Sequence, residues 1–349
     1  MKIALVSDIH FGVRKGNDLF LDSQMRFFKE VFIPKLIKED ITDIFILGDL
    51  MDNRNNINVK ILSEVTRLFR VDLKDFDIRI LCGNHDIYYK TSIKINSLAF
   101  LDILPNVQVI EDITVDKAIL EKTGKKILQV PWIVDEEDFL KRVSNENVEC
   151  DYCFGHFELE GFNLTRYVVS HGGQDPNMIL DNYIRTYSGH YHNKSRKRQG
   201  DKYIQYLGCP FHLTRSDIGD DKGFFIIDLD TDTDEFVKNN VSMEFKRINY
   251  PDKFTKKDIE GNIIDVHIDY DENYKESMVQ KYLRILEKYK PALTPSLKIE
   301  NKMLAGEIEE IEHQSIEDLL EEYINSLAIT NKSHILETIV NLYRQCDKE

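Results

Sequence analysis

Cysteine and long apolar runs are scarce in this chain of 349 residues, and its 46 basic residues are outnumbered by 61 acidic ones. Its five cysteines are scattered and odd in number, which argues against a disulfide framework and favours a reducing cytoplasm. No apolar run approaches the roughly 20 residues that cross a bilayer, so no membrane partner is expected. The N-terminal KIALV stretch leads into Asp8 and His10, and we interpret it as a buried strand rather than a signal peptide.

The chain also lacks a basic excess. Its net charge of −15 argues against a protein that coats nucleic acid by bulk electrostatics. Part of this charge is local, because residues 301–349 hold eleven acidic residues and four basic ones. No GxSxG, Walker A or GxGxxG motif occurs, which excludes nucleophile-elbow hydrolases, P-loop NTPases and dinucleotide-binding enzymes. Cys150 and Cys153 have CxxC spacing, but without a second pair we interpret both as core residues.

The composition changes along the chain in a way that predicts several units. Short β-rich runs alternate with helix-like segments up to about residue 240, as in a layered α/β domain. Helical spacing covers 22–38, where Pro34 predicts a kink or restart, and 59–70. We therefore expect a large α/β domain over 1–240, a small α+β domain over 241–290, an acidic linker over 291–313 and a helical segment over 314–349.

The last segment has two amphipathic stripes. Ser315 and Asp318 resemble a helix-capping pair, and apolar residues then recur at helical spacing up to Tyr343. This helical pair either packs on its own domain or docks on a partner protein. The spacing does not choose between these alternatives.

Five short motifs, each at the end of a predicted strand, hold most of the candidate metal ligands. Half of the ten histidines lie in them. Strand ends are where α/β folds place their sites. Any one motif occurs by chance, whereas five in order are specific. The motifs are Asp8-Ile9-His10, Gly48-Asp49-Leu50-Met51-Asp52, Gly83-Asn84-His85-Asp86, Gly155-His156 and Gly189-His190-Tyr191-His192.

These residue types suit two adjacent divalent cations. A shared carboxylate can bridge the cations while imidazoles and an amide oxygen complete the shells, a set that fits manganese, iron or zinc better than calcium. Two cations about 3.5–4 Å apart can activate a hydroxide and brace an in-line phosphoryl displacement. The glycine that precedes a ligand in four of the motifs lets the backbone turn sharply after the strand.

With this motif series, residues 1–195 resemble the calcineurin-like metallophosphoesterases. The resemblance implies an α/β/β/α sandwich. It implies that Asp8, His10, Asp49 and His192 bind one metal and that Asp49, Asn84, His156 and His190 bind the other, with Asp49 bridging. It also implies that His85 acts on the scissile phosphate and that Asp52 orients His85.

Within that superfamily, nearly the whole chain looks like the nuclease subunits of SbcCD-type DNA break-repair complexes, most closely those of T-even-like phages. The phrases SDIHFGV, GDLMDNR, VPWIVDEE and YLGCPFHLT carry this likeness. It implies a manganese-dependent double-strand exonuclease and single-strand endonuclease, and a homodimer formed through helices, for which 59–70 and 93–104 are candidates. It makes 241–290 a DNA-capping domain and 314–349 the contact with an SMC-like ATPase, in the host cytoplasm if the chain is phage-encoded.

Three rival interpretations remain open. A protein phosphatase shares the metal set, but its GDxxDRG motif is not matched, because Asn53 separates Asp52 from Arg54. A small-molecule phosphodiesterase would also use this site. A metal-stabilised scaffold for a partner is the non-enzymatic alternative, which His85 opposes because a structural metal site needs no non-ligand histidine.

Basic residues near the motifs are candidate DNA contacts. Arg14, Arg54 and Lys90 follow motif loops and could touch the phosphate backbone. The basic run 194–198 is interpreted as a solvated hairpin turn in preference to a phosphate contact. His171 and His212 lie outside the motifs and are treated as structural or substrate-rim residues.

Overall fold

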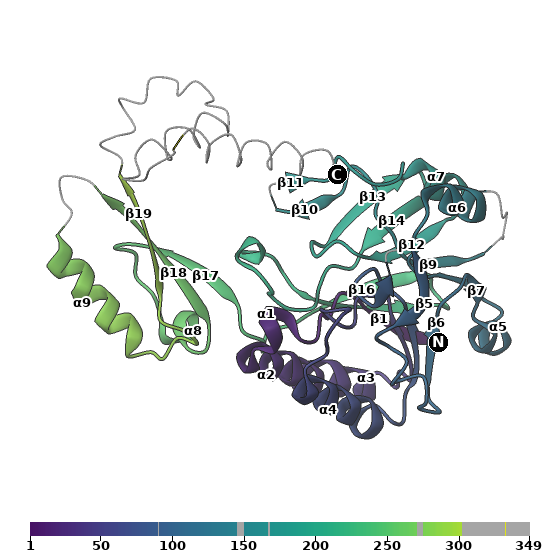
Figure 1. Ribbon diagram of the computed structural model, residues 1–349, viewed down its shortest axis with the longest axis horizontal. Helices are drawn as coiled ribbons and strands as arrows, with labels where there is room; N and C mark the ends of the chain where they lie inside the picture. Colours follow the sequence, from purple (N-terminus) through teal and green to yellow (C-terminus); the bar gives the residue numbers. More distant parts are fainter. Residues whose placement is uncertain (90, 145–149, 167, 271–274, 302–331, 333–349) are drawn as a thin grey trace. The chain divides into compact units, whose positions relative to one another are not determined.

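Two six-stranded sheets stack face to face in the computed structural model, and helices cover their outer faces (Figure 1). The structure describes residues 1–89, 91–144, 150–166, 168–270, 275–301 and 332. Lys90 and, apart from Lys332, the segment predicted to be helical over 314–349 lie outside the described residues. The chain divides into two compact units, Met1–His267 with Ser277–Leu297, and Ile268–Glu276 with Lys298–Glu349. Both large sheets lie in the first unit.

The first sheet has the strand order β16-β15-β1-β2-β3-β6. Neighbouring strands from β1 to β6 run parallel, whereas β15 and β16 are antiparallel additions at one edge. Strand β2 is buried at every position, which explains its unbroken apolar run. The bounds are β1 Lys2–Val6, β2 Asp43–Ile46, β3 Asp77–Leu81, β6 Val107–Ile110, β15 Gly223–Asp228 and β16 Thr233–Lys238.

The second sheet has the order β13-β14-β12-β9-β8-β7. Its four central strands are parallel, and β13 and β7 pair antiparallel at the two edges. The bounds are β7 Thr114–Val115, β8 Ile127–Val130, β9 Tyr152–His156, β12 Arg185–Gly189, β13 Ser195–Gln199 and β14 Lys202–Tyr206. The basic run 194–198 thus lies mostly in an edge strand rather than in a turn, because β13 pairs along its whole length with β14.

Three apolar clusters hold the layers together. Leu5 and Phe45 of the first sheet meet Phe154 and Tyr187 of the second in the core between the sheets. The outer face of the first sheet is covered by α2 Asp18–Phe27, α3 Ile33–Lys38 and α4 Val59–Arg67, and that of the second by α6 Glu136–Phe139 and α7 Asn177–Asn182. The predicted α/β/β/α layering is therefore confirmed.

Shorter helices complete this domain. They are α1 Val13–Gly16, α5 Lys117–Thr123, the π-helical turns η1 Phe28–Phe32, η2 Leu68–Asp72 and η3 Leu140–Ser144, and the 3₁₀ turn η4 Arg215–Asp217. Pro34 lies at the start of α3, directly after the π-helical turn η1, and helical backbone angles continue from α2 through η1 into α3. The irregularity predicted at Pro34 is thus a π-helical turn within a continuous helix, and no separate helix begins there.

An α+β appendage follows the large domain. It consists of β17 Phe245–Asn249, α8 Lys256–Ile259, β18 Ile263–Tyr270, α9 Glu276–Glu287 and β19 Ser296–Asn301, with the sheet order β17-β18-β19. Phe245 and Ile263 pack against Phe20 of α2, and His212 accepts the Phe245 N–H at 3.2 Å. Strand β19 occupies residues predicted to be linker. Prolines interrupt helices, but they also precede strands. The prolines before β19 therefore do not mark the end of the appendage, which extends past the predicted bound at residue 290.

The segment 93–104 is not a helix, and this prediction is wrong. Strand β5 Ser92–Asn96 pairs antiparallel with β4 Ile87–Tyr89, and turns follow it. The β-branched Ile93 and Ile95 favour an extended backbone once a partner strand lies beside them. A second short hairpin joins β10 Asn163–Thr165 and β11 Val168–Val169.

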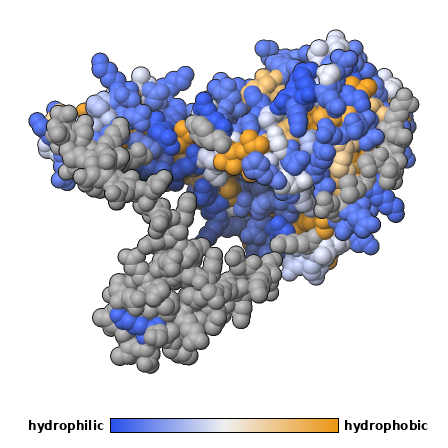
Figure 2. Space-filling view, turned by 90° about the horizontal axis from the view of Figure 1, so that it is seen from above, coloured by the Kyte–Doolittle hydropathy of each residue, from blue (hydrophilic) through white to orange (hydrophobic). Residues whose placement is uncertain are grey.

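Hydrophilic side chains dominate the face shown in Figure 2, and the hydrophobic ones form small separate patches. Within the described ranges, no helix combines the length and apolar character that a bilayer crossing requires.

A buried ion-pair network joins the two sheets. Arg79 of β3 donates to Asp43 of β2 at 2.7 Å and to Asp116 at 2.8 Å. Asp116 also caps α5 by accepting the Ile119 N–H. All three charged groups are nearly inaccessible to solvent. Asp43 has a second, more distant cation in Lys122 at 3.5 Å, so Asp116 is the carboxylate that depends most on the guanidinium.

Replacing this guanidinium is expected to destabilise the fold. Arg79→Met should lower the free energy of unfolding by about 3 kcal/mol or more, because the buried Asp116 carboxylate loses its cation and Asp43 keeps only the more distant Lys122. Urea denaturation followed by circular dichroism measures the change. Arg67→Met is the matched control, since its pairs with Glu64 and Asp72 are half-exposed, and it should cost under about 1 kcal/mol. Equal losses in both variants would contradict the argument.

Candidate metal centre

The seven predicted ligands come from the carboxyl ends of five parallel strands. Asp8 and His10 follow β1, Asp49 follows β2 and Asn84 follows β3 in the first sheet. His156 ends β9, and His190 and His192 follow β12, in the second sheet. Backbone bonds tie the first two loops, with Asp8 N–H donating to Gly48 O at 3.1 Å and His10 N–H to Asp49 O at 3.0 Å.

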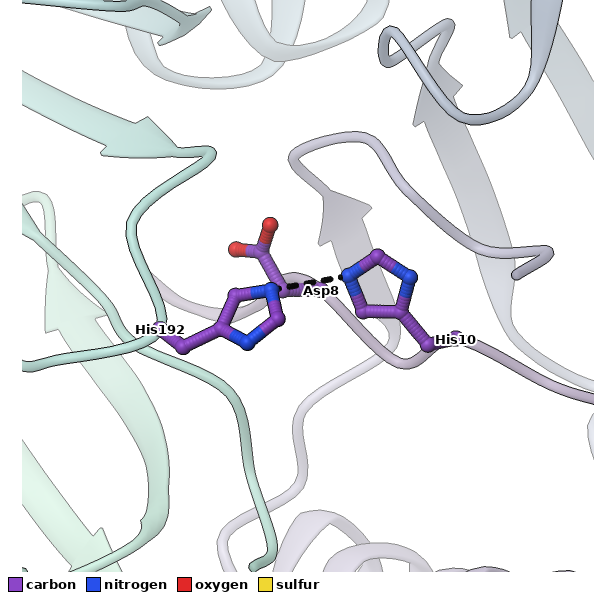
Figure 3. A group of neighbouring side chains, drawn as sticks. All are labelled: Asp8, His10 and His192. Atoms are coloured by element: carbon purple, nitrogen blue, oxygen red, sulfur yellow. Dashed lines mark hydrogen bonds between the residues drawn. The ribbon is translucent and has the colours of Figure 1, made fainter. Parts of the chain in front are cut away.

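One group consists of Asp8, His10 and His192. Their ligand atoms lie within 4.8 Å of one another. The two Nε2 atoms of His10 and His192 meet at 3.0 Å, with the Asp8 carboxylate beside them (Figure 3). Nδ1 of the buried His10 makes no hydrogen bond to the described residues. Two imidazole nitrogens and a carboxylate that converge in this way form a donor set for a borderline divalent cation.

A second group contains Asp49, His156 and His190. Oδ1 of Asn84 lies 3.0 Å from both His156 Nε2 and His190 Nδ1. Because His156 Nδ1 lies 2.6 Å from the Leu47 carbonyl, that nitrogen carries the hydrogen. In neutral His156, Nε2 and the Asn84 oxygen are then two acceptors facing each other, an arrangement that a shared cation satisfies. These residues therefore fit a metal.

The Asp49 carboxylate contacts both groups. Oδ2 lies 3.8 Å from His10 Nε2 and 3.5 Å from His156 Nε2. Oδ1 accepts the His85 N–H at 2.8 Å. One oxygen of Asp49 thus faces both candidate sites, which is the position that a bridging ligand needs.

Burial and neighbouring charges set the protonation of these donors. Burial raises the pKa of Asp49, but His156, His10 and His85 together hold it well below its usual range. Burial lowers the pKa of His10, and it lowers that of His190 to about 3, so both imidazoles are neutral. The pKa of His156 is raised to about 9, because Asp49 outweighs the effect of burial. A carboxylate and neutral imidazoles are the states that bind cations.

The backbone of the ligand loops is strained. Asp8, His10, Asp49 and His190 have φ angles of 54°, 50°, 52° and 89°, in the left-handed region that non-glycine residues rarely adopt. Each such residue costs on the order of 1–3 kcal/mol, and such residues cluster at functional sites. The strain turns each ligand inward directly after its strand.

Asp86 ties two ligand loops together, a role that the sequence analysis did not assign. Its fully buried carboxylate accepts N–H groups from Gly83 at 2.9 Å, Met51 at 3.0 Å and Leu50 at 3.4 Å. Burial raises the pKa of Asp86 to about 7. The loop after β2 and the loop after β3 are thus joined through one side chain.

His85 and Asp52 also meet, through the backbone of Asp52. Nδ1 of His85 lies 2.9 Å from the backbone carbonyl of Asp52, whereas the Asp52 carboxylate lies 3.7 Å from Nδ1 of His10. The main chain of Asp52 therefore orients His85. The side chains of His10, Asp52 and His85 form a third group of potential ligands.

The basic candidates lie in different surroundings. Arg14 is exposed and donates to Leu213 O at 3.3 Å. Burial raises the pKa of the nearby Asp52, and Arg14 opposes this only weakly. Arg54 is half-buried. In the 194–198 run, Lys194 lies over the Phe236 ring at 3.4 Å and Arg196 pairs with Asp234. These intramolecular contacts account for the basic residues Lys194 and Arg196 of the run.

Two further residues outside the motifs have clear surroundings. His212 is a structural residue, because it binds the start of the appendage, whereas His171 is exposed. Trp132, the single tryptophan of the chain, was missed by the sequence analysis. Its ring lies 5.2 Å from that of His190 at an interplanar angle of 30°. Its position after β8, the strand next to β9, is the signal that could have indicated it.

The chain is similar to one protein family and to one phage protein. Residues 1–194 match the family described as calcineurin-like phosphoesterase. "Exonuclease subunit 1" of Enterobacteria phage T4 is 30% identical over 334 residues, covering 94% of this chain and 93% of that protein.

Solved structures are more distant. A dimetal phosphatase from Danio rerio is 11% identical with a TM-score of 0.35, and covers 65% of this chain and 91% of its own. A Vps29 mutant from Entamoeba histolytica is 15% identical with a TM-score of 0.31, and covers 69% of this chain and 100% of its own.

The close packing around Gly83 leads to a prediction. A Cβ at this position would lie 2.2 Å from Asp49 Oδ1 and 2.3 Å from Asp49 N, so Gly83→Ala must displace the central carboxylate. Mn²⁺ affinity in isothermal titration calorimetry should fall about 10- to 100-fold, the range for disturbed ligand supports. Gly172→Ala, where nothing lies within 4 Å, should leave the affinity unchanged. An unaltered Mn²⁺ affinity in Gly83→Ala would show that Asp49 does not bind the metal.

Proposed function

This chain belongs to the calcineurin-like phosphoesterase family, and on that basis we propose that it is a metal-dependent DNA nuclease, both a double-strand exonuclease and a single-strand endonuclease. DNA is proposed as the substrate because of the 30% identity with an exonuclease subunit. This similarity extends over 94% of the chain and therefore beyond the phosphoesterase residues 1–194. The convergent strand-end side chains support the chemistry.

Two divalent cations, most suitably Mn²⁺, are the proposed cofactors. Asp8, His10, Asp49 and His192 would hold one, and Asp49, Asn84, His156 and His190 the other, in accord with the two groups of side chains. When bound, such cations stabilise the charge that develops on the phosphoryl oxygens during in-line displacement. His10 and His190 are neutral and Asp49 is anionic, so these donors would accept a cation without a preceding proton loss, whereas His156, with its pKa raised to about 9, would release a proton as the cation binds.

His85 is the proposed catalytic residue that is not a ligand. Its Nδ1 is held by the carbonyl of Asp52, which leaves Nε2 to stabilise charge on the scissile phosphate or to protonate the leaving oxygen. The Asp49 carboxylate fixes the His85 backbone at 2.8 Å, so the same residue that faces both cation sites also positions the proton donor. The Asp52 side chain, near His10, would support that ligand.

The chain is proposed to work as a homodimer with an SMC-like ATPase, in the cytoplasm of its cell or host. The ATPase contact is assigned to 314–349 and DNA capping to the α+β appendage, which includes β19. Of the two segments expected at the dimer interface, only α4 is a helix, and its Val59 is 79% exposed. A protein-phosphatase activity has no specific structural feature in its favour.

Nuclease assays on linear duplex DNA with Mn²⁺ test this proposal. Wild type should degrade the duplex. His85→Ala should lose at least about 100-fold in rate while keeping its Mn²⁺ affinity, because only proton transfer is removed. Asp49→Asn should lose Mn²⁺ affinity as well as rate, because both groups lose their shared carboxylate. His171→Ala, an exposed histidine outside the motifs, is the control and should match wild type.

Two results would refute parts of this assignment. If wild type, His85→Ala and Asp49→Asn are equally active on DNA, the proposed centre is not the active site. If wild type hydrolyses phosphopeptides and leaves duplex and single-stranded DNA intact, the protein-phosphatase alternative replaces the nuclease.

Arg14 and Arg54 are proposed to touch the DNA backbone, as is Lys90, which lies outside the described residues. Each lost phosphate contact should reduce the slope of log affinity against log salt by about 1, so the Arg14→Ala, Arg54→Ala double variant should lose about 2. Fluorescence anisotropy with a labelled duplex measures it. Arg26→Ala, whose partner is Glu30 on an exposed helix face, should keep the slope. An unchanged slope in the double variant excludes both contacts.

A further inference from the structure

A small cavity lies directly beside the candidate centre. It has a volume of about 130 Å³ and is lined on one side by His156 of the second ligand group. Trp132, Val134, Phe139 and Phe157 supply apolar and aromatic walls. The cavity is therefore a largely apolar recess that adjoins the candidate ligand His156, and the function proposed above assigns it no role.

The rim of this cavity is polar. Glu158, Gly173 and Gln174 complete its lining. Backbone bonds hold the rim, because the Gln174 N–H donates to Glu158 O at 2.8 Å. Gly173 has a φ of 96°, and a Cβ there would lie 2.5 Å from Glu158 O, so the rim admits no larger residue. An acidic side chain at the rim repels phosphate and accepts hydrogen bonds from amino groups.

Trp132 connects this cavity with the centre. Its ring lies 5.2 Å from that of His190 at a tilt of 30°, and edge-on to that of His156 at 6.0 Å. It also lines a second cavity, of about 490 Å³, so the indole is reachable from two sides. An accessible indole next to phosphate-binding residues is the arrangement with which proteins stack a nucleobase.

Resting on the nuclease function above, we propose that the Trp132 cavity is a nucleobase subsite, which takes the base of a nucleotide next to the scissile phosphate. The phosphate lies at the cation ligands, the base against Trp132, and its amino-bearing edge at Glu158 and Gln174. A base can enter such a recess only after it leaves the duplex stack. Cleavage of double-stranded DNA thus requires local unpairing, whereas a single strand enters directly.

Because Trp132 is the single tryptophan, its fluorescence reports on the subsite alone. Wild-type protein with a saturating divalent cation is titrated with dAMP and with 2-deoxyribose 5-phosphate, which has the same phosphate and no base. We expect dAMP to quench the emission and to bind about tenfold tighter, in keeping with one base–aromatic stack. Equal affinities and no base-dependent quenching overturn the subsite.

A cleavage assay tests the same subsite during turnover. The substrates are a single-stranded oligonucleotide and versions with an abasic residue on either side of one linkage. In wild type, the abasic residue on the subsite side should lower kcat/KM about tenfold. In Trp132→Leu the intact-to-abasic ratio should fall to about 1, whereas Trp132→Phe, which keeps an aromatic face, should retain most of it. The ratio is measured within each variant, so a partly folded variant does not distort it.

The outcomes separate the two proposals. If wild type cleaves neither oligonucleotide but binds dAMP in a base-dependent way, the nuclease function fails and the subsite stands. If wild type cleaves all oligonucleotides equally and shows no base-dependent quenching, the nuclease function stands and the subsite is wrong.

Discussion

The buried Asp49 carboxylate is the contact on which the rest of the centre depends. One oxygen faces His10 and His156, which come from different sheets, and the other holds the backbone of His85. The stacking of two parallel-stranded sheets makes this possible, because their strand ends meet at one place. A shift of either sheet would separate the two groups of donors.

Sequence alone could predict those parts of the molecule that depend on local pattern. Buried strands leave apolar runs, and in four of the five motifs a glycine stands directly before the candidate ligand. The layered α/β order and the meeting of all seven ligand positions follow from that pattern, because parallel strands present their carboxyl ends at a common edge. The helix irregularity before Pro34 is equally local, since proline disturbs a helix through its own missing N–H.

Features that depend on distant partners could not be predicted in this way. Strand β5 exists because β4 lies beside it, and its apolar residues read equally well as a helical stripe. The same holds for β19, which follows two prolines, and for the basic run, whose charges contact neighbouring strands. The proximity of Trp132 to the candidate centre follows from the pairing of β8 with β9, which the local sequence pattern does not show. The role of Asp86 depends on its three N–H donors, which the motif alone does not indicate.

The Asp86 carboxylate has a consequence for how the centre exchanges its ions. Hydrogen bonds to Asp86 join the loops of Asp49 and Asn84 within the protein itself, so we expect the candidate ligands to assemble before any cation binds. Small metal domains that fold only on loading behave in the opposite way. In a centre built like this one, loading and loss of ions form a reversible equilibrium of the folded chain. Occupancy then follows the free concentration of divalent cation in the surroundings, and metal supply acts directly on the fraction of competent molecules.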